Sequence, residues 1–293
     1  MTLPATAKAI RLVQVSDTHL SRERGHFNAN FAVFSELMQA NPPDFIVNSG
    51  DLSLNGADVE DDLVFAKAWH DQLAAPWAAI PGNHDIGEAP TFSRLKQPLN
   101  AERMQRFERI VGPRWWKREI GGWLLVGLDS SLLASELPDE RRQMDFLGEA
   151  LAGTPGNRKL VFLHMPPYEN DPGNPKFTTH AVPFPARGRL LDVCVRGGVR
   201  AIACAHLHVH RSLSHRGMQI VWAPTTAFVN IARHIASGYG IARAGYLEWT
   251  LDGDNLSHRL VEPHQMITQD VGRWNDEVGS TITMPPFSAR WPV

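Results

Sequence analysis

The chain has 293 residues, of which 43% are hydrophobic and 20% are charged, and its formal net charge is -2. This is an ordinary globular balance with enough apolar residues for a sizeable core, and without a Lys/Arg block no nucleic acid is expected as a partner. Residues 1–10 lack the pattern of a signal peptide, and no stretch approaches the ~20 apolar residues of a membrane span. Only two cysteines occur, Cys194 and Cys204, and we expect both to be buried thiols. These features predict a cytoplasmic protein without a membrane anchor.

Short apolar runs alternate with amphipathic segments in the first third of the chain. Strands are predicted at 10–15, 45–47 and 77–80. Helices are predicted at 28–40, where Phe27, Phe31, Phe34 and Met38 recur at helical spacing, and around Val59, Leu63, Ala66 and Leu73, which share one face. This alternation predicts βαβ units and a largely parallel sheet.

The second half of the chain repeats this theme and ends in hairpins. Strands are predicted at 123–128, 160–163 and 201–205, and Met144, Leu147 and Leu151 mark a helix between the first two. Hairpins are predicted over 211–222, turning at Arg216-Gly217, and over 244–261, turning at Asp252-Gly253. We therefore expect two sheets packed face to face, with helices outside.

The domain organisation is predicted to be simple. Residues 1–263 are expected to form one domain, and 264–293 to form a C-terminal extension that packs on this domain or on a partner subunit. Six prolines fall between 165 and 185, which indicates a long constrained loop. A loop of this length in a compact domain is often functional.

Five short motifs directly follow predicted strands. They are Asp17-Thr18-His19, Gly50-Asp51, Gly82-Asn83-His84-Asp85, His164, and His206-Leu207-His208. Ligands bind at the carboxyl ends of strands in open α/β sheets, so we expect these motifs to converge. Their Asp, His and Asn side chains suit borderline divalent metals and are too many for one ion. The set fits two metals that share one carboxylate, an arrangement that hydrolyses phosphate esters.

The spacing within the motifs suggests individual roles. Asp17 and His19 are two residues apart, which in extended backbone places both on one face, and His206 and His208 repeat this spacing. The carboxylate of Asp51 can bridge two cations, and Asn83 offers an amide oxygen. His84 is expected to point elsewhere and donate a proton, with Asp85 accepting from its other ring nitrogen. His210 continues the alternation and is left out of the ligand set.

Together these motifs resemble the calcineurin-like metallophosphoesterases over about 10–210. The sequences Ser16-Asp17-Thr18-His19-Leu20 and Pro81-Gly82-Asn83-His84-Asp85 are most similar to class III cyclic-nucleotide phosphodiesterases and related bacterial glycerophosphodiesterases. The resemblance implies a four-layer αββα sandwich of two mixed β-sheets flanked by helices. It implies that Asp17, His19, Asp51 and His208 hold one metal, that Asp51, Asn83, His164 and His206 hold the other, and that His84 is the proton donor or a phosphate contact. Ala205 departs from the glycine that usually precedes the His-x-His pair.

The function expected on this basis is hydrolysis of a small soluble phosphodiester, either a cyclic nucleotide or a glycerophosphodiester. Two divalent ions, from Mn, Fe and Zn, would share Asp51 and generate a bridging hydroxide that attacks phosphorus. A phosphomonoesterase with the same site stays an alternative. A nuclease is disfavoured because no basic tract occurs, and a non-catalytic scaffold because every ligand is present. Relatives are commonly dimers or larger, so a homo-oligomer is expected. Candidates for specificity are His26, Tyr168, Asn170 and His180.

Overall fold

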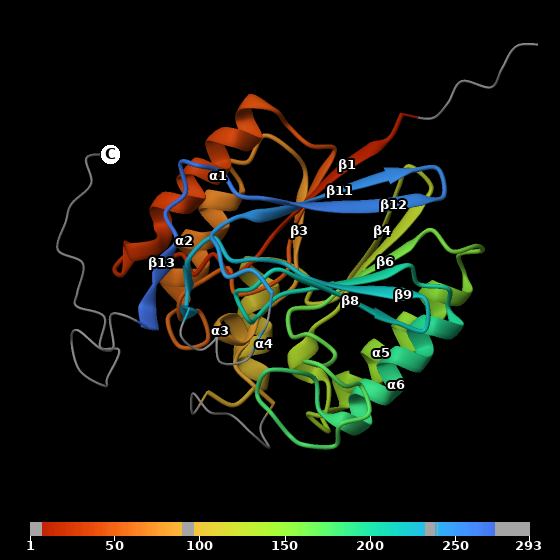
Figure 1. Ribbon diagram of the computed structural model, residues 1–293. Coiled ribbons are helices and arrows are strands. Elements are labelled where there is room, and N and C mark those ends of the chain that lie inside the picture. The colour runs from red at the N-terminus through yellow and green to blue at the C-terminus, as the bar shows by residue number, and fades with distance from the viewer. Residues whose placement is uncertain (1–7, 90–96, 232–237, 239, 273–293) are drawn as a thin grey trace, which may run out of the picture.

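Two mixed β-sheets form the middle of the molecule (Figure 1). The computed structural model describes residues 8–89, 97–231, 238 and 240–272. The first sheet has five strands in the order β12 (Asn255–Val261), β11 (Tyr246–Asp252), β1 (Ile10–Val15), β2 (Phe45–Asn48) and β3 (Trp77–Ala79). The second has six in the order β4 (Trp116–Ile120), β5 (Trp123–Gly127), β6 (Lys159–Phe162), β7 (Ala201–Cys204), β9 (Met218–Trp222) and β8 (Arg211–His215). In the first sheet β1, β2 and β3 pair in parallel up to one edge, and β11 and β12 pair antiparallel at the other. In the second sheet the middle pairs are parallel, and the edge strands β4 and β8 pair antiparallel.

Helices cover the outer face of each sheet, which makes four layers. In Figure 1, α1 (Asn28–Ala40) and α2 (Glu60–His70) lie at the upper left, and α5 (Pro138–Ala152) and α6 (Phe184–Arg196) at the lower right. The shorter elements are η1 (Gly25–Phe27), α3 (Asn83–Ile86), α4 (Ala101–Ile110) and η2 (Ser130–Leu132). The expected αββα sandwich of two mixed sheets is confirmed.

The alternation of side chains along each strand explains the layers. In β1, Leu12 belongs to the core between the two sheets, whereas Val13 and Val15 pack with residues of α1 and α2. The strand is buried on both faces, as expected when parallel strands lie between covering layers. Burying one apolar side chain of this kind stabilises the fold by ~1.5–3 kcal/mol. Both faces of the sheet therefore contribute to stability.

Most predicted elements are found, with differences at their ends. Helix α2 begins at Glu60, after Val59, whose backbone is extended and whose side chain is 39% exposed. It ends at His70, so the buried Leu73 lies beyond it. Only Leu63 and Ala66 of the predicted apolar face are therefore buried helix residues. The predicted face for this helix was too long at both ends.

Three elements of five or more residues are absent from the sequence-based expectation. Helix α6 begins inside the predicted 165–185 loop, with Pro185 in its first turn, where a missing N–H costs nothing. Helix α4 buries only Phe107, and β4 exposes three of its five residues. In α4, Met104, Phe107 and Ile110 recur at helical spacing and pack against the core, a signal that the sequence-based expectation missed. No clear apolar alternation identifies β4.

The predicted hairpins are present. Strands β8 and β9 are joined at Arg216-Gly217, both of which have positive φ (50° and 82°), as a type I′ turn requires. In the second hairpin Asp252 pairs with Asn255, so the turn lies at Gly253-Asp254, one residue later than predicted.

Three further features bear on the sequence-based expectations. The small β10 (Phe228–Val229) pairs in parallel with β13 (Gln269–Asp270), while 273–293 lie outside the described residues. Cys194 and Cys204 are free and buried, as predicted. Among the described residues, no helix combines the length and the apolar character needed to cross a bilayer.

Candidate metal centre

The five motifs meet where neighbouring strands of both sheets end. The first sheet contributes the loops after β1, β2 and β3, and the second contributes the loops after β6 and β7. These loops carry Asp17 and His19, Asp51, Asn83 and His84, His164, and His206 and His208. The expected convergence at the carboxyl ends of the strands is therefore present in the structure.

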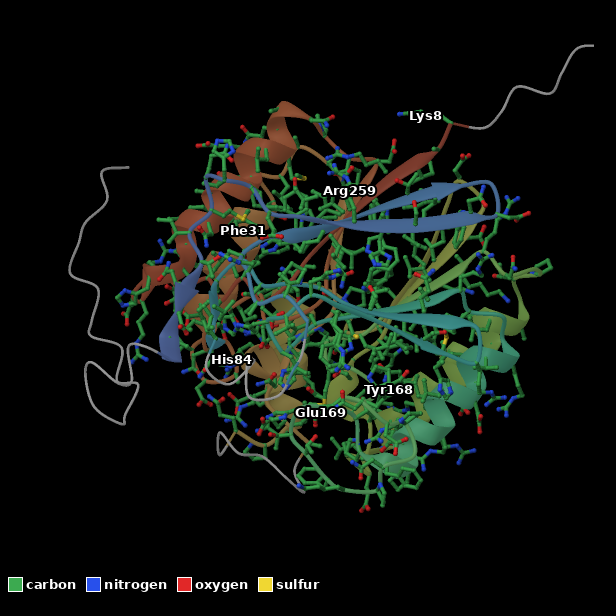
Figure 2. The ribbon with its side chains drawn as sticks, viewed as in Figure 1. Lys8, Phe31, His84, Tyr168, Glu169 and Arg259 are labelled. Atoms are coloured by element: carbon green, nitrogen blue, oxygen red, sulfur yellow. The ribbon has the colours of Figure 1, made fainter. Side chains whose placement is uncertain are left out.

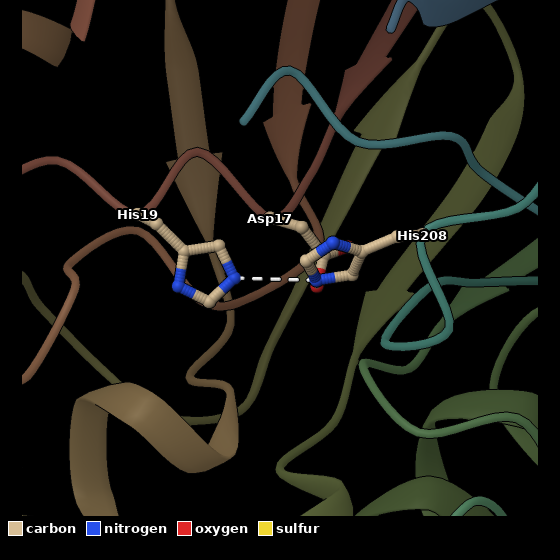
Figure 3. A group of neighbouring side chains, drawn as sticks. All are labelled: Asp17, His19 and His208. Atoms are coloured by element: carbon tan, nitrogen blue, oxygen red, sulfur yellow. Dashed lines mark hydrogen bonds and ion pairs between the residues drawn. The ribbon is translucent and has the colours of Figure 1, made fainter. Parts of the chain in front are cut away.

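Asp17, His19 and His208 form the first group of donor atoms (Figure 3). Nε2 of His208 lies 3.2 Å from Oδ1 of Asp17, and Nε2 of His19 lies 3.3 Å from Nε2 of His208. All three residues are buried. One donor atom from each lies within 4.8 Å of the others, a spacing at which a single cation can be held.

Asp51 connects this group to a second one. Its Oδ2 lies 3.2 Å from Nε2 of His164 and 3.8 Å from Nε2 of His19. Nε2 of His164 also lies 3.2 Å from Oδ1 of Asn83 and 3.2 Å from Nδ1 of His206. Asp51 thus lies between His19 on one side and the His164–His206 pair on the other, so its carboxylate is within reach of both groups.

The residues fit a metal site on their own chemistry. Nδ1 of His19 is buried without a hydrogen-bond partner among the described residues, and Oδ1 of the buried Asp17 makes an ion-pair contact with Nε2 of His208 but no regular hydrogen bond there. Burial disfavours the charge of Asp17, but His208 outweighs this effect and lowers its pKa to about 2. Burial also disfavours the charge of His164, but Asp51 outweighs it and raises its pKa to about 9. Protonated imidazoles thus compensate the buried carboxylates, a role that divalent cations would take over as protons leave.

The backbone at the ligands differs from the expected extended conformation. Asp17, His19, Asp51, His206 and His208 all have positive φ, between 44° and 73°. For residues with a side chain this left-handed region costs ~1–2 kcal/mol each, and such strain concentrates at functional sites. The extended backbone predicted for these pairs is therefore wrong, although Asp17 and His19 do share one group of donor atoms, as expected. His208 joins Asp17, whereas His206 joins Asp51.

The expected pairing of His84 with Asp85 is also wrong. Nδ1 of His84 lies 2.7 Å from the carbonyl oxygen of Leu54, so this carbonyl orients the ring. The Asp85 carboxylate instead accepts hydrogen bonds from the backbone N–H groups of Leu52, Ser53 and Gly82 and from the hydroxyl of Ser53. Asp85 therefore ties the Asp51 loop to the start of α3 and is a structural residue.

Backbone carbonyls also orient three histidines of the donor groups. Nδ1 of His164 lies 3.0 Å from the Ser49 carbonyl, and Nε2 of His206 lies 3.0 Å from the Thr179 carbonyl. Nδ1 of His208 faces the Phe228 carbonyl. Because every residue carries a carbonyl, no sequence signal identifies these partners, although they fix the tautomer of each ligand.

Ala205 fits the site despite its methyl group. Its φ is not positive, its side chain is fully buried, and its N–H donates to the carbonyl of His164. The glycine usual at this position is therefore not required by the backbone conformation here.

The candidates for specificity lie in different surroundings. Tyr168 is 2% exposed and packs in the core between the second sheet and its helices, so it does not face a substrate. Its neighbour Glu169 is labelled beside it in Figure 2. The Glu169 carboxylate accepts a hydrogen bond from the hydroxyl of Thr178 and lies 3.3 Å from Nδ1 of His180 within the same loop. Asn170 accepts a hydrogen bond from Arg211.

Comparison with known proteins agrees with this geometry. A probable cyclic nucleotide phosphodiesterase of Synechococcus sp. is 29% identical over 171 residues, which cover 55% of this chain and 60% of the relative. A probable glycerophosphodiester phosphodiesterase of Arcobacter nitrofigilis is 29% identical over 220 residues, covering 67% and 71%. The chain thus spans less than two thirds of the first relative. A dimetal phosphatase of Danio rerio shares the fold, with a TM-score of 0.56, 14% identity, and coverage of 88% and 98%.

The family comparison covers the motifs themselves. The model of the calcineurin-like phosphoesterases matches residues 10–210, a range that begins with β1 and contains every ligand-bearing loop described above. The match covers more than half of the chain, and the architecture agrees with it. The chain belongs to the calcineurin-like phosphoesterase family.

Proposed function

We propose that this protein is a binuclear metal-dependent phosphodiesterase acting on small soluble diesters, namely cyclic nucleotides or glycerophosphodiesters. The observation that carries the proposal is the position of Asp51 between two groups of donor atoms. The relatives named as phosphodiesterases support the reaction class and suggest the two kinds of substrate.

Two sets of side chains would hold the ions. The proposed ligands are Asp17, His19, Asp51 and His208 for one ion, and Asp51, Asn83, His164 and His206 for the other. Imidazole, carboxylate and amide donors suit manganese, iron or zinc. When bound, the ions supply Lewis acidity and a nucleophile of lowered pKa at the phosphorus atom.

His84 is proposed to manage the proton of the leaving group. A carbonyl oxygen only accepts, so the contact with Leu54 places a proton on Nδ1 of His84 and leaves Nε2 to exchange a proton with the substrate. The ring lies edge-on to the ring of His19, with 4.6 Å between their centroids, beside the first donor group. From there His84 can protonate the departing alkoxide, a contribution worth about 10²–10⁴-fold in rate.

The substrates suggest where the enzyme works. We propose a cytoplasmic enzyme, because its substrates are small and soluble and its two thiols are free and buried. We also propose that the protein assembles as a homo-oligomer.

A side-by-side comparison of two chromogenic substrates tests the reaction class. The kcat/KM for bis-p-nitrophenyl phosphate and for p-nitrophenyl phosphate would be measured on protein supplied with manganese, with metal-free protein as the control. We expect a clear preference for the diester and loss of turnover without metal. A preference for the monoester would instead make the protein a phosphatase that uses the same residues.

A further inference from the structure

A buried chain of hydrogen bonds connects α2 to the loop after β2. His70, the last residue of α2, is fully buried against the rings of Phe31 and Trp77, with centroids 4.6 and 5.0 Å away. Its Nε2 lies 2.8 Å from Nδ2 of Asn48, the last residue of β2. Oδ1 of Asn48 in turn accepts a hydrogen bond of 2.9 Å from the backbone N–H of Gly50. None of these residues belongs to the groups of donor atoms.

The chemistry of the groups permits only one arrangement of this chain. The N–H of Gly50 can only donate, so the amide oxygen of Asn48 must face it and the NH₂ must face His70. Nε2 of His70 therefore accepts, and its Nδ1 carries the proton, which is donated to the carbonyl of Ala66 at 2.8 Å. Burial lowers the pKa of His70 to about 4, which keeps the ring neutral, as this arrangement requires.

Gly50 is the residue at which this series of hydrogen bonds reaches the candidate metal centre. Its carbonyl accepts from the N–H of Asp17 at 3.0 Å, and a Cβ built on it would lie 2.5 Å from Nδ1 of His164. Its φ of 107° lies in a region that glycine adopts readily and other residues rarely do. Because glycine has no side chain, no side-chain contact of its own can fix this conformation. The bond to Asn48 fixes this peptide, and the next residue is Asp51. Rotation of the peptide would move the shared carboxylate relative to Asp17 and His164.

We infer that His70 and Asn48 are positioning residues that hold the Gly50–Asp51 peptide for metal binding, although neither touches an ion. The inference rests on the proposed function in that Asp51 is taken to be a metal ligand. It predicts that metal affinity depends on a hydrogen-bond acceptor at position 70.

Manganese affinity of variants, measured by titration calorimetry, tests this inference, with the melting temperature of the metal-free protein recorded beside it. His70→Leu leaves the NH₂ of Asn48 without an acceptor and frees the amide to turn, so we expect manganese binding to weaken about tenfold or more. His70→Gln keeps an acceptor and should bind close to wild type. Lys159→Met is the matched control, because Lys159 makes buried bonds to the carbonyls of Leu151 and Gly197 at the opposite end of β6. It should lower the melting temperature and leave affinity unchanged.

A second variant keeps the inference testable if His70→Leu does not fold. Asn48→Ala removes the acceptor of the Gly50 N–H and leaves His70 bonded to Ala66, so the same weakening is expected. Either variant binding manganese as tightly as wild type, with only a lower melting temperature, would overturn the inference. Wild-type protein that binds no manganese would overturn the proposed function and this inference with it.

Discussion

Single residues in this site are held mainly by backbone groups. His84 is oriented by the Leu54 carbonyl, and His164 and His206 by the carbonyls of Ser49 and Thr179. Within the described part of the chain, the Asp85 carboxylate accepts hydrogen bonds from Leu52, Ser53 and Gly82, which belong to the loops that it joins. His84 and Asp85 are neighbours in the sequence but differ in role, because His84 faces the site and Asp85 supports the loops around it.

The role of His84 predicts a variant that binds metal but does not turn over. His84→Ala removes the proton donor and none of the proposed ligands, so kcat for bis-p-nitrophenyl phosphate should fall about 10²–10⁴-fold, while manganese affinity stays near wild type. Steady-state kinetics and calorimetry on the same preparation check this. Unchanged turnover would show that another group protonates the leaving oxygen.

Asp85 should behave as a structural residue. Asp85→Asn replaces one accepting oxygen by an NH₂ that faces backbone N–H groups, so we expect a loss of ~1–3 kcal/mol in the free energy of unfolding. Denaturant unfolding of the metal-free protein measures this loss. If Asp85 instead oriented His84, the variant would keep its stability and lose turnover.

At the scale of elements, helix α6 fixes the loop 163–183 that precedes it. Arg187 is 4% exposed, and its guanidinium donates to the carbonyls of Val182, Pro172 and Asn174. The same loop carries the Thr179 carbonyl that orients His206. The loop before α6 therefore supports His206, whose carbonyl partner Thr179 lies 27 residues earlier in the chain.

Replacement of Arg187 should loosen this loop. Arg187→Met removes the donor of the buried Val182 carbonyl and of the partly buried Pro172 and Asn174 carbonyls, so we expect faster proteolysis within 163–183 and a loss of ~1–3 kcal/mol in the free energy of unfolding. Arg189→Met is the control, because the Arg189 side chain is 60% exposed and its ion pair with Glu140 is worth ~0–1 kcal/mol. Equal behaviour of the two variants in limited proteolysis would contradict the supporting role of Arg187.

The sequence was informative where the pattern is local and periodic. Buried strands such as β1 and β6 and the turn at Arg216-Gly217 were predictable, because apolar runs and a glycine turn are visible in the chain. The left-handed conformation of Asp17 was not predictable, because it depends on contacts made by distant loops. The backbone of Asp17, for example, bonds to Gly50 and to Thr225.

For the whole molecule, the site depends on the packing of the two sheets. The first sheet supplies Asp17 and Asp51, and the second supplies His164 and His208. Gln14 joins them between the layers, since its NH₂ donates to the Ser49 hydroxyl and to the Cys204 carbonyl. The site therefore forms only in the folded protein, and metal binding should stabilise the fold. The boundary at residue 263 stays a prediction.

The most direct test of the binuclear site is a manganese titration of metal-free protein in which bound ions per chain and turnover of bis-p-nitrophenyl phosphate are followed together. We predict two bound ions per chain, with turnover reaching its plateau as the second site fills, and loss of both in Asp51→Asn. Full turnover with a single bound ion, or an Asp51→Asn protein that still binds two ions and works, would contradict the account.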